Sequence, residues 1–430
     1  MSHNIRSLLT MNRPCSCGKR HPVSLRALMM ESGALSKLPE TVSALGEYKH
    51  LVMISDDNTY AAAGKCAEAF LREEWLCDGR SLQSISLSTP EGGLHATEVT
   101  VGEVMEEMGD CDLLVAVGAG TVHDITRYVA TQMGVDFISV PTAASVDGFL
   151  SSIAAMTWHG VKRSFPAKPP IALIADIDVL AAAPYALTAS GVGDLLGKYT
   201  ALFDWRVSHI VTGEYVCETV ISLEEDALAA LLACKDAVAS KDPAAVETVM
   251  YGLLLSGLAM QMVGNSRPAS GSEHHVSHLI EMDVITEDNP ALHGEKVGVA
   301  AALVADRYHK LLALPAQTLH SRSYEGLPID RIQTVFASRA DEVLTAENTP
   351  DPLEGLTAEA LLSHWEELRA LAKRTLPTGQ EIIAMLSDMG AKSTLTDIDL
   401  SEDLWDTLWE MSPFVRRRLT LMRLSKLVGE

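Results

Sequence analysis

The chain has 430 residues, of which 47% are hydrophobic and 21% are charged. This length exceeds what one compact core usually accommodates, so two domains are expected. The 34 basic and 57 acidic residues give a formal net charge of −23. Such a charge repels nucleic acid and requires an anionic small molecule to find its cations locally.

Apolar runs along the chain are short. Those at 51–54, 113–117 and 171–175 have the length of strands and fall far below that of a membrane span. The N-terminal segment lacks the apolar region and small-residue cleavage site of a signal peptide. We therefore expect a cytoplasmic protein without a membrane span.

The cysteines do not form a disulfide framework. There are seven, and five stand singly, so they are expected to be reduced core residues. The exception is Cys15-Ser-Cys17-Gly-Lys-Arg-His21, which offers three metal-ligand side chains within seven residues. Without a second cluster nearby this falls short of a zinc-finger pattern, and a structural or incidental role is favoured over a metal site.

The first half of the chain alternates between strand and helix patterns. Strands are predicted at 51–55, 81–88, 111–118, 136–141 and 169–176, and helices at 60–74, 97–108 and 122–133. Alternation at this spacing indicates a parallel sheet with helices on both faces. We expect residues 1–187 to form a Rossmann-like α/β domain that binds a dinucleotide.

The pattern changes after Pro184. Long stretches rich in alanine, leucine and methionine occupy 223–238, 244–263 and 297–314, and strand signals disappear. An all-α domain is therefore predicted for residues 188–430, binding metal and substrate, with the active site in the cleft between the two domains.

A Gly-x-Gly turn follows the strand at 111–118. Glycines between a strand and a helix allow close approach of a pyrophosphate, and the helix N-terminus supplies free N–H groups. His123 stands where the usual dinucleotide fingerprint has a third glycine, so a simple tight connection remains an alternative. The residues concerned are Gly118, Ala119, Gly120, Thr121 and Val122.

Two further polar segments follow predicted strands. Asp56 is placed to accept hydrogen bonds from ribose hydroxyls, and a second segment offers hydroxyls and backbone donors (Thr142, Ala143, Ala144, Ser145). The alternative is that Asp56, Thr142 and Ser145 only cap helices. Because all three segments lie at carboxyl ends of strands, where α/β sheets bind ligands, a nucleotide site is favoured.

The helical half contains a candidate metal site. Asp194 lies in Ser-Gly-Val-Gly-Asp-Leu-Leu-Gly-Lys, three histidines lie within five residues (His274, His275, His278), and His293 opens a later helical stretch. Imidazole and carboxylate donors suit zinc, nickel or iron(II). Helix caps or hydrogen-bonded core histidines are the alternative, and the clustering favours the metal.

These segments resemble the sn-glycerol-1-phosphate dehydrogenases, within the superfamily of iron-type alcohol dehydrogenase, glycerol dehydrogenase and dehydroquinate synthase. The N-terminal Cys-x-Cys-Gly-x-x-His resembles the bacterial, arabinose-operon-linked branch. The resemblance runs from about residue 15 to 300 and rests on GAGTVHD, PTAASVDGFLSS, VKRSFPAKPP, SGVGDLLGK, NSRPASGSEHHVSH and HGEKVG. It implies a dehydroquinate synthase-like fold and a homodimer.

The resemblance also implies roles for individual residues. Asp194, His274 and His293 correspond to metal ligands, and Asp147, Asp194 and His278 to substrate contacts, with Asp194 and His278 catalytic. The His-x-x-His spacing of the glycerol dehydrogenase branch would place the ligand on His275, whereas the GSEH context favours His274. Dinucleotide contacts correspond to Asp56, Gly118 to Val122, Thr142 to Ser145, and Ser151.

The implied reaction is the reversible reduction of dihydroxyacetone phosphate to sn-glycerol 1-phosphate, with one divalent metal ion (nickel or zinc, with iron(II) as a third option). Asp56 favours NAD(H) over NADP(H), because a carboxylate disfavours a 2′-phosphate. Alternatives are a glycerol dehydrogenase, another polyol dehydrogenase or carbocycle synthase, and a non-catalytic ligand-binding protein. Candidate cations for the substrate phosphate are Lys162, Arg163, Lys168, Arg267 and Lys296.

Overall fold

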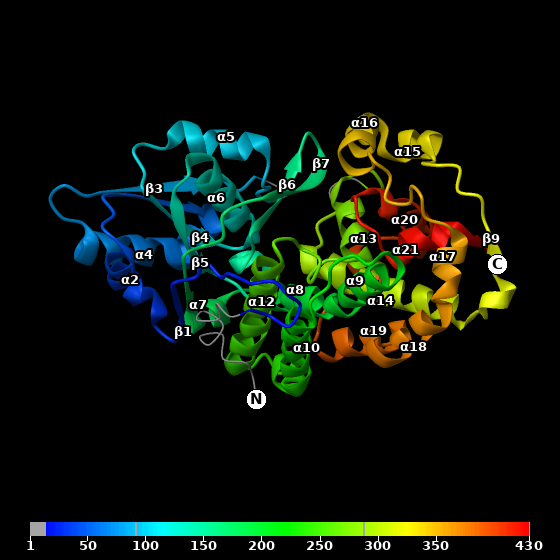
Figure 1. Ribbon diagram of the computed structural model, residues 1–430. Coiled ribbons are helices and arrows are strands. Elements are labelled where there is room, and N and C mark those ends of the chain that lie inside the picture. Colours follow the sequence, from blue (N-terminus) through cyan, green and yellow to red (C-terminus); the bar gives the residue numbers. More distant parts are fainter. Residues whose placement is uncertain (1–13, 91–92, 287–288, 430) are drawn as a thin grey trace. The chain divides into compact units, whose positions relative to one another are not determined.

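The structure is a computed structural model that describes residues 14–90, 93–286 and 289–429 (Figure 1). The chain forms two compact units. Unit 1 comprises the described residues up to 158, together with 163–191 and 222–266. Unit 2 comprises 159–162, 192–221 and the described residues from 267 onward.

A six-stranded sheet forms the centre of unit 1. Its order is β1-β8-β5-β4-β2-β3, and every pair is parallel. The strands are β1 (Ala27–Glu31), β2 (His50–Asp56), β3 (Ser81–Leu87), β4 (Leu113–Gly118), β5 (Asp136–Pro141) and β8 (Ala172–Asp176).

Both faces of this sheet are covered by helices, because side chains of its central strands point alternately to two apolar cores. Leu113, Val115 and Val117 of β4 join one core with α2 (Leu38–Leu45) and α4 (Lys65–Phe70). Leu114 and Ala116 join the other with α5 (Glu98–Glu107) and α6 (Gly120–Met133). The chain after β2 is helical over 57–75, with α3 (Asp57–Thr59) preceding α4 and single π-type turns at Tyr60–Gly64 and Leu71–Trp75, and residues 76–80 lead into β3.

Three strands in the first half of the chain lie outside the sequence prediction. The edge strand β1 has the sequence Ala-Leu-Met-Met-Glu, whose residues favour helix, and it forms a strand because it pairs with β8. The hairpin β6 (Ile153–Trp158) and β7 (Val161–Pro166) turns at His159 and Gly160, which both have positive φ, as tight two-residue hairpin turns require.

Unit 1 also contains helices that follow its sheet in the chain. They are α7 (Ile177–Ala182), most of α10 (Glu218–Ala233), α11 (Lys235–Ala239) and α12 (Pro243–Val263), while α8 (Tyr185–Leu196) begins in unit 1 and ends in unit 2. Helix α12 is long and apolar enough to span a membrane, but 78% of its most apolar window is buried inside the structure. A core helix meets the length and hydropathy criteria in the same way.

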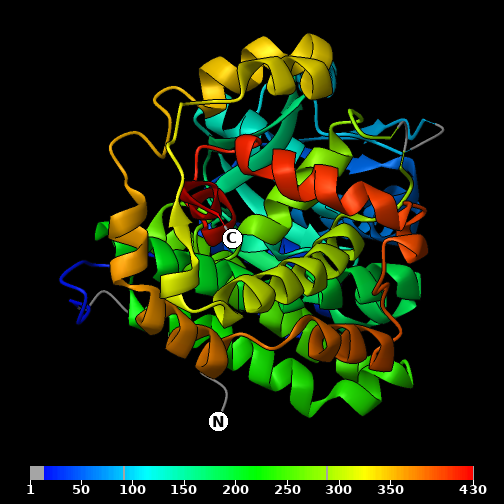
Figure 2. The same ribbon diagram turned by 90° about the vertical axis from the view of Figure 1, so that its right-hand side faces the viewer.

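Unit 2 is built almost entirely of helices. It contains α9 (Lys198–Thr212), α13 (Ser272–Glu281), α14 (His293–Ala313), α15 (Ile329–Phe336), α16 (Ala340–Glu342), α17 (Ala358–Ser363), α18 (Trp365–Thr375), α19 (Gly379–Asp388), α20 (Trp405–Met411) and α21 (Leu421–Leu424). Two short strands, β9 (His320–Ser321) and β10 (Val428–Gly429), pair antiparallel. Helices α13 and α14 lie side by side in it (Figure 2).

The predicted fold class, a parallel α/β sheet followed by helices, is confirmed. The packing of unit 1 includes residues 222–266, which the sequence assigns to the helical half. The functional division at residue 187, with cofactor bound before it and metal after it, remains a proposal.

Candidate active site

Three of the predicted cofactor segments follow neighbouring strands. In the sheet β5, β4 and β2 are adjacent and parallel, so their carboxyl ends lie along one edge. The chain leaves β2 toward β3 on one side, and leaves β4 toward β5 on the other. Sheets of this kind bind ligands beside such a switch point, which here falls between Asp56 and Gly118.

The Gly118–Val122 turn is fixed by packing within the protein. A Cβ on Gly118 would lie 2.5 Å from Cβ of Val122, and one on Gly120 would lie 2.9 Å from Val146. Helix α6 follows directly, and its N-cap residue, Ala119, makes no side-chain cap hydrogen bond. Ala119, Gly120 and Thr121 are half-buried, so this helix N-terminus is accessible to an anion.

His123 explains why the third glycine of the usual fingerprint is absent. Its ring is buried between α6 and β5, with Nδ1 2.9 Å from the Ala119 carbonyl and Nε2 2.7 Å from the Ser139 hydroxyl. Burial lowers its pKa to about 3, against the opposing Ala119 hydrogen bond, so the ring is neutral. The His123 side chain therefore connects α6 to β5, a contact that glycine could not make.

Asp56 caps the helix that follows β2. Its Oδ1 accepts a hydrogen bond from the Thr59 backbone N–H at 2.8 Å, and the Thr59 hydroxyl accepts one from the Asp56 N–H at 3.0 Å. The cap engages one carboxylate oxygen. Capping and ribose binding are therefore compatible, and the ribose role stays a prediction.

The 142–145 segment is held against α8. Thr142 N–H donates to the Gly118 carbonyl at 3.0 Å, and the Ser190 hydroxyl donates to the Ser145 carbonyl at 3.2 Å. A Cβ on Gly191 would lie 2.1 Å from the Ala144 carbonyl oxygen, so only glycine fits there. The next element is a short 3₁₀ helix, η4 (Asp147–Leu150), which follows Val146, so neither Thr142 nor Ser145 caps it.

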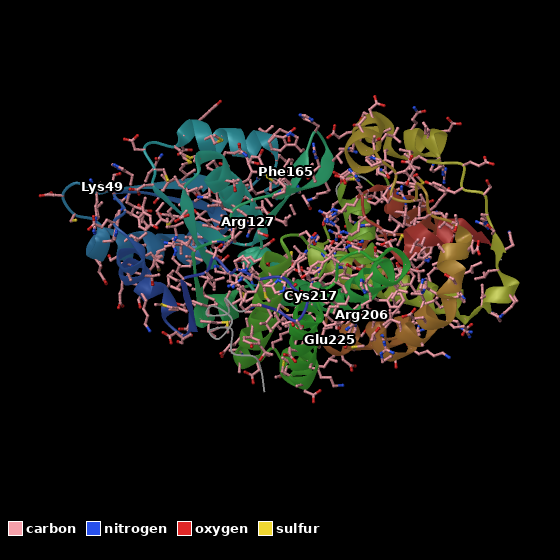
Figure 3. All side chains as sticks on the ribbon, viewed as in Figure 1. Lys49, Arg127, Phe165, Arg206, Cys217 and Glu225 are labelled. Atoms are coloured by element: carbon pink, nitrogen blue, oxygen red, sulfur yellow. The ribbon has the colours of Figure 1, made fainter. Side chains whose placement is uncertain are left out.

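Arg127, which sequence analysis missed, supports this region from α6 (Figure 3). Its guanidinium is fully buried, pairs with Asp124 at 2.5 Å, and donates to the carbonyls of Gly148 and Ile153. These carbonyls flank Ser151, whose hydroxyl accepts a hydrogen bond from the Ile153 N–H at 2.9 Å. The predicted cofactor contact Ser151 thus lies in a hydrogen-bonded turn.

Asp147 opens η4 and is nearly buried, at 9% exposure. Its Oδ2 lies 2.9 Å from the Ser256 hydroxyl of α12, which also lies 3.0 Å from Glu224. A Cβ on Gly257 would lie 2.9 Å from the Asp147 carbonyl oxygen, which lets α12 approach η4 closely.

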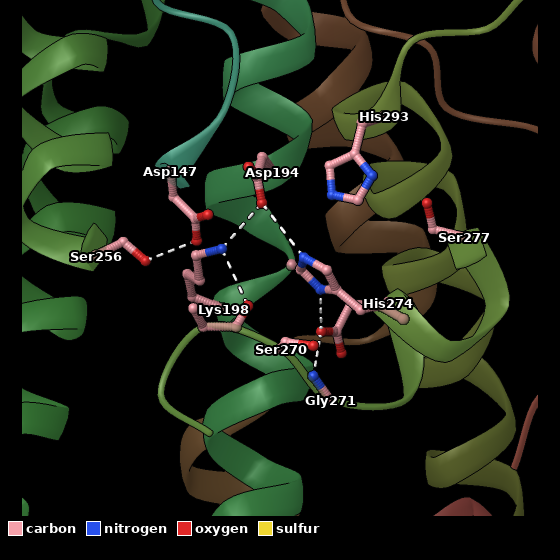
Figure 4. Close-up of polar contacts among 12 residues, drawn as sticks. Asp147, Asp194, Lys198, Ser256, Ser270, Gly271, His274, Ser277 and His293 are labelled. Atoms are coloured by element: carbon pink, nitrogen blue, oxygen red, sulfur yellow. Dashed lines mark hydrogen bonds and ion pairs between the residues drawn. The ribbon is translucent and has the colours of Figure 1, made fainter. Parts of the chain in front are cut away.

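The predicted metal ligands come together within unit 2. Asp194 lies near the end of α8, His274 in α13 and His293 at the start of α14, and one ligand atom from each lies within 4.8 Å of the others (Figure 4). The Asp194 carboxylate is fully buried, with Oδ1 3.7 Å from His274 Nε2. The two imidazole centroids are 5.3 Å apart.

Glycines allow these helices to touch. A Cβ on Gly193 would lie 2.1 Å from the Gly294 carbonyl oxygen, and one on Gly298 would lie 2.9 Å from Gly193 Cα. Helices α8 and α14 therefore meet backbone to backbone, which places Asp194 beside His293. Gly271 has the same function before α13, because its Cβ would lie 2.8 Å from Ala201 Cα.

Both histidine rings are fixed through Nδ1. His274 Nδ1 lies 2.8 Å from Glu273 Oε1, and His293 Nδ1 lies 2.7 Å from Glu281 Oε1. Each Nε2 is thereby left as the ligand nitrogen, in the arrangement that metal-binding histidines commonly show. The donor set of one carboxylate and two imidazoles fits a catalytic divalent cation with open coordination positions.

Lys198 is a charged neighbour that the sequence did not reveal. Its fully buried ammonium donates to Asp194 Oδ1 at 3.0 Å and to the Ala269 carbonyl at 3.1 Å. Burial raises the pKa of Asp194, but Lys198 and the two histidines outweigh that effect and lower it. Asp194 is therefore held as a carboxylate.

A second ligand group shares His293 and consists of His278, Glu281 and His293. In it Glu281 is already engaged on both oxygens, by His293 Nδ1 at 2.7 Å and by Lys162 Nζ at 3.2 Å. We therefore favour the Asp194, His274 and His293 set for the metal.

His275 and His278 differ in their surroundings. The His278 ring lies 6.0 Å from that of His274 and 5.8 Å from that of His293. His275 is fully buried, and neither of its nitrogens has a hydrogen-bond partner among the described residues. Burial, followed by nearby arginines, lowers the pKa of both histidines, so both are neutral.

The five predicted phosphate cations are mostly engaged within the protein. Lys162 pairs with Glu281, Arg163 stacks on Phe165 at 5.2 Å, and Lys168 donates to the Gly134 carbonyl at 2.7 Å. Lys296 lies 3.3 Å from the Asn289 carbonyl. Arg267 is buried and pairs with Glu214.

Buried Arg416 and half-buried Arg418 of the C-terminal segment join Arg267, and sequence analysis missed both. Arg416 Nη1 lies 3.5 Å from the Ser270 hydroxyl, and Arg418 donates to the Ser270 carbonyl. Burial lowers the pKa of Arg418, and the like charges of Arg416 and Arg267 lower it further. Arginine stays charged at neutral pH, so the cluster of Arg267, Arg416 and Arg418 attracts an anion. The Arg-Arg-Arg run at 416–418 was its only sequence signal.

The fold and the ligand set together define an enzyme of the iron-containing alcohol dehydrogenase class. Residues 29–184 match the family described as iron-containing alcohol dehydrogenase. Solved structures show the same fold. A maleylacetate reductase from Agrobacterium tumefaciens aligns with a TM-score of 0.58 at 16% identity, over 91% of each chain. A glycerol dehydrogenase from Schizosaccharomyces pombe aligns at 0.55 and 15%, over 93% of this chain and 94% of its own.

Closer relatives identify the family. A glycerol-1-phosphate dehydrogenase [NAD(P)+] from Halalkalibacterium halodurans is 32% identical over 98% of both chains. One from Bacillus velezensis is 38% identical over 72% of this chain and 80% of its own. The chain belongs to the glycerol-1-phosphate dehydrogenase family, and it is an oxidoreductase. The predicted family and fold class are thereby confirmed.

Proposed function

We propose that this protein reversibly reduces dihydroxyacetone phosphate to sn-glycerol 1-phosphate with a nicotinamide dinucleotide. Hydride passes from the reduced nicotinamide to C2 of the ketone, a proton is added to the C2 oxygen, and the oxidised dinucleotide is released. The observation that carries the proposal is the convergence of Asp194, His274 and His293 in a chain that matches a glycerol-1-phosphate dehydrogenase over 98% of its length.

Asp194, His274 and His293 would hold the divalent cation. When bound, such a cation supplies a Lewis acid that polarises the ketone. Nickel and zinc are proposed, with iron(II) as an alternative, because all three accept imidazole and carboxylate donors. Glu273 and Glu281 keep the two rings in the ligand orientation, and Lys198 keeps Asp194 ionised.

The proposed dinucleotide site lies at the β2–β4 switch point. The α6 N-terminus at 119–121 supplies N–H groups to the pyrophosphate, and Asp56 accepts hydrogen bonds from ribose hydroxyls. A carboxylate at that position repels a 2′-phosphate, so NADH is preferred over NADPH. Thr142 to Ser145 and Ser151 are the remaining proposed contacts.

The substrate phosphate is proposed to bind the cluster of Arg267, Arg416 and Arg418. Planar guanidinium groups match phosphate oxygens in charge and geometry. Burial lowers the pKa of His278, and the positive charge of nearby Arg416 lowers it further. The centre of the His278 ring lies 6.0 Å from that of His274 and 5.8 Å from that of His293. We propose that His278 contacts the substrate between its phosphate and the metal, and that it relays the proton. Asp147 is proposed as a further substrate contact.

The test is an NADH-oxidation assay on protein stripped by chelation and reloaded with single metals. We expect turnover of dihydroxyacetone phosphate far above that of dihydroxyacetone, and an sn-1 product. Replacing Arg418 by Met should raise the KM for dihydroxyacetone phosphate while leaving turnover of dihydroxyacetone unchanged. Equal rates on both substrates would instead indicate a glycerol dehydrogenase, and an sn-3 product would refute the proposal.

A cytoplasmic homodimer is proposed as well. The resemblance to the family supports the dimer, and the burial of the apolar α12 supports a location in an aqueous compartment. Sedimentation at several concentrations tests the dimer.

A further inference from the structure

The N-terminal Cys-Ser-Cys-Gly-Lys-Arg-His segment forms a compact turn in unit 1. The Cys15 N–H donates to the Lys19 carbonyl at 2.9 Å, and the Gly18 N–H donates to the Cys15 carbonyl at 2.9 Å. Gly18 has a φ of 83°, which favours glycine at this position. The turn brings the side chains of Cys15, Cys17 and His21 to one side, and the proposed dehydrogenase reaction uses none of them.

These three side chains present ligand atoms that lie within 4.8 Å of one another. Cys17 Sγ is 3.3 Å from His21 Nε2. Two ligands of one tetrahedral zinc ion, with bonds of about 2.3 Å to sulfur and about 2.05 Å to nitrogen, are separated by roughly 3.6 Å. The observed spacing is therefore close to that of a shared zinc ion.

The His21 ring is fixed in the tautomer that a metal needs. Its Nδ1 lies 2.6 Å from the Met262 carbonyl, and because a carbonyl only accepts hydrogen bonds, Nδ1 carries the proton. The lone pair is left on Nε2, the nitrogen that faces Cys17. The ring is only 6% exposed, so this orientation is set by the protein.

We propose that Cys15, Cys17 and His21 hold a structural zinc ion, separate from the Asp194 site. Two thiolates and one imidazole are soft donors that select zinc, whereas the Asp194 set contains no sulfur. The ion would fasten the N-terminal turn to the end of α12. Ser24 N–H donates to Gln261 Oε1 at 3.2 Å, and Gln261 in turn donates to the Leu150 carbonyl of η4, beside Ser151.

Cobalt(II) substitution tests the proposal, because only thiolate ligands give an intense thiolate-to-cobalt band in the near ultraviolet. We expect the reduced full-length protein to show this band, and Cys17→Ser to lose most of it. The Asp194 site cannot contribute, so the result does not depend on the proposed function. Cys66→Ser, which replaces an exposed cysteine, is the matched control and should leave the band unchanged.

Zinc usually takes four ligands in structural sites, so the other cysteines are also replaced by serine and their cobalt spectra compared. Cys217 is the buried one among them and is tested first. A weaker cobalt band in Cys217→Ser would support the proposal by adding a third thiolate.

A second measurement covers variants that fail to fold. Titration of the wild-type protein with a thiol-specific mercurial should release about one equivalent of zinc, and removal of that zinc should lower the thermal midpoint. A reduced wild-type protein without the cobalt band overturns the proposal. So does a band that persists in the folded Cys15→Ser/Cys17→Ser double variant.

Discussion

His274 and His293 are oriented by the same device, a glutamate oxygen within 2.8 Å of the ring Nδ1. For His274 the partner is Glu273, its neighbour in sequence, and for His293 it is Glu281, at the end of another helix. Both rings therefore carry their proton on Nδ1 and leave Nε2 for a cation. Asp194, with Oδ1 3.7 Å from His274 Nε2, completes the set.

The first prediction separates His274 from His275. His274→Ala should abolish metal binding and activity together, because it removes one of the three proposed ligands. Without the metal the transition state loses several kcal/mol of charge stabilisation, which at about 1.4 kcal/mol per tenfold lowers the rate by orders of magnitude. His275→Ala should retain the metal, since this buried ring, near three arginines, belongs to neither of the two ligand groups around His293. His278→Ala should keep the metal and lose rate. Elemental analysis of the three folded variants decides, and a metal-free His275→Ala would move the ligand by one residue.

The second prediction concerns Glu281 as a positioning residue. Glu281→Gln keeps the shape of the side chain but weakens its hold on His293 Nδ1 and removes the charge that faces Lys162. Metal affinity should fall by about 10- to 100-fold, as for other partners of ligand histidines. Competition with a metal-sensitive dye measures it. The control Glu106→Gln alters an exposed glutamate of α5, and equal affinities in the two variants would contradict the assignment.

The third prediction tests Asp56 with a substitution that keeps its cap. Asp56→Asn retains an oxygen for the Thr59 N–H but loses the carboxylate charge. The KM for NADH should rise roughly 10- to 100-fold, the value of a charged hydrogen bond of about 1.5–3 kcal/mol, and the gap to NADPH should narrow. Asp242→Asn, at the cap of α12, is the matched control. An unchanged KM would leave Asp56 with the capping role alone.

The fourth prediction concerns pH and the buried Asp204. Burial raises the pKa of its carboxyl to about 6 from an ordinary 3.8. Because the folded protein holds a proton on Asp204 more tightly than the unfolded chain does, the protonated carboxyl stabilises the fold fully below about pH 3.8. This stabilisation is lost as the pH rises to about 6. The loss is up to roughly 3 kcal/mol, at about 1.4 kcal/mol per unit.

Asp204→Asn does not titrate, so it should gain thermal stability relative to the wild type between pH 4 and 6. Titrations common to both proteins cancel in this difference. The carboxylate accepts hydrogen bonds from the Leu421 and Ser272 N–H groups, so the variant is expected to differ by a constant offset as well. Parallel curves of thermal midpoint against pH would show that the carboxyl keeps its ordinary pKa.

The sequence by itself determined the central strands of the parallel sheet and which segments carry the candidate ligand residues. A continuous apolar run such as Leu113 to Val117 must be covered on both faces, so it indicates a strand buried in a parallel sheet. The closeness of Asp194, His274 and His293 was expected from the resemblance of their flanking motifs to the family, whereas spacing alone left His275 and His278 as alternatives. The edge strand β1 was not, because its alanine, leucine and methionine residues form a strand only when β8 offers a ladder.

Tertiary structure alone decided what surrounds those groups. Glu281 and Arg418 are ordinary charged residues in the sequence. They come to contact His293 and Ser270 only because segments distant along the chain pack together, as α8 and α14 do at Gly193 and Gly298. His21 is a possible metal ligand by sequence, but its tautomer is fixed only by the carbonyl of Met262, 241 residues away. Contacts of this kind depend on how buried helices pack, and local periodicity carries no information about which side chains then face one another.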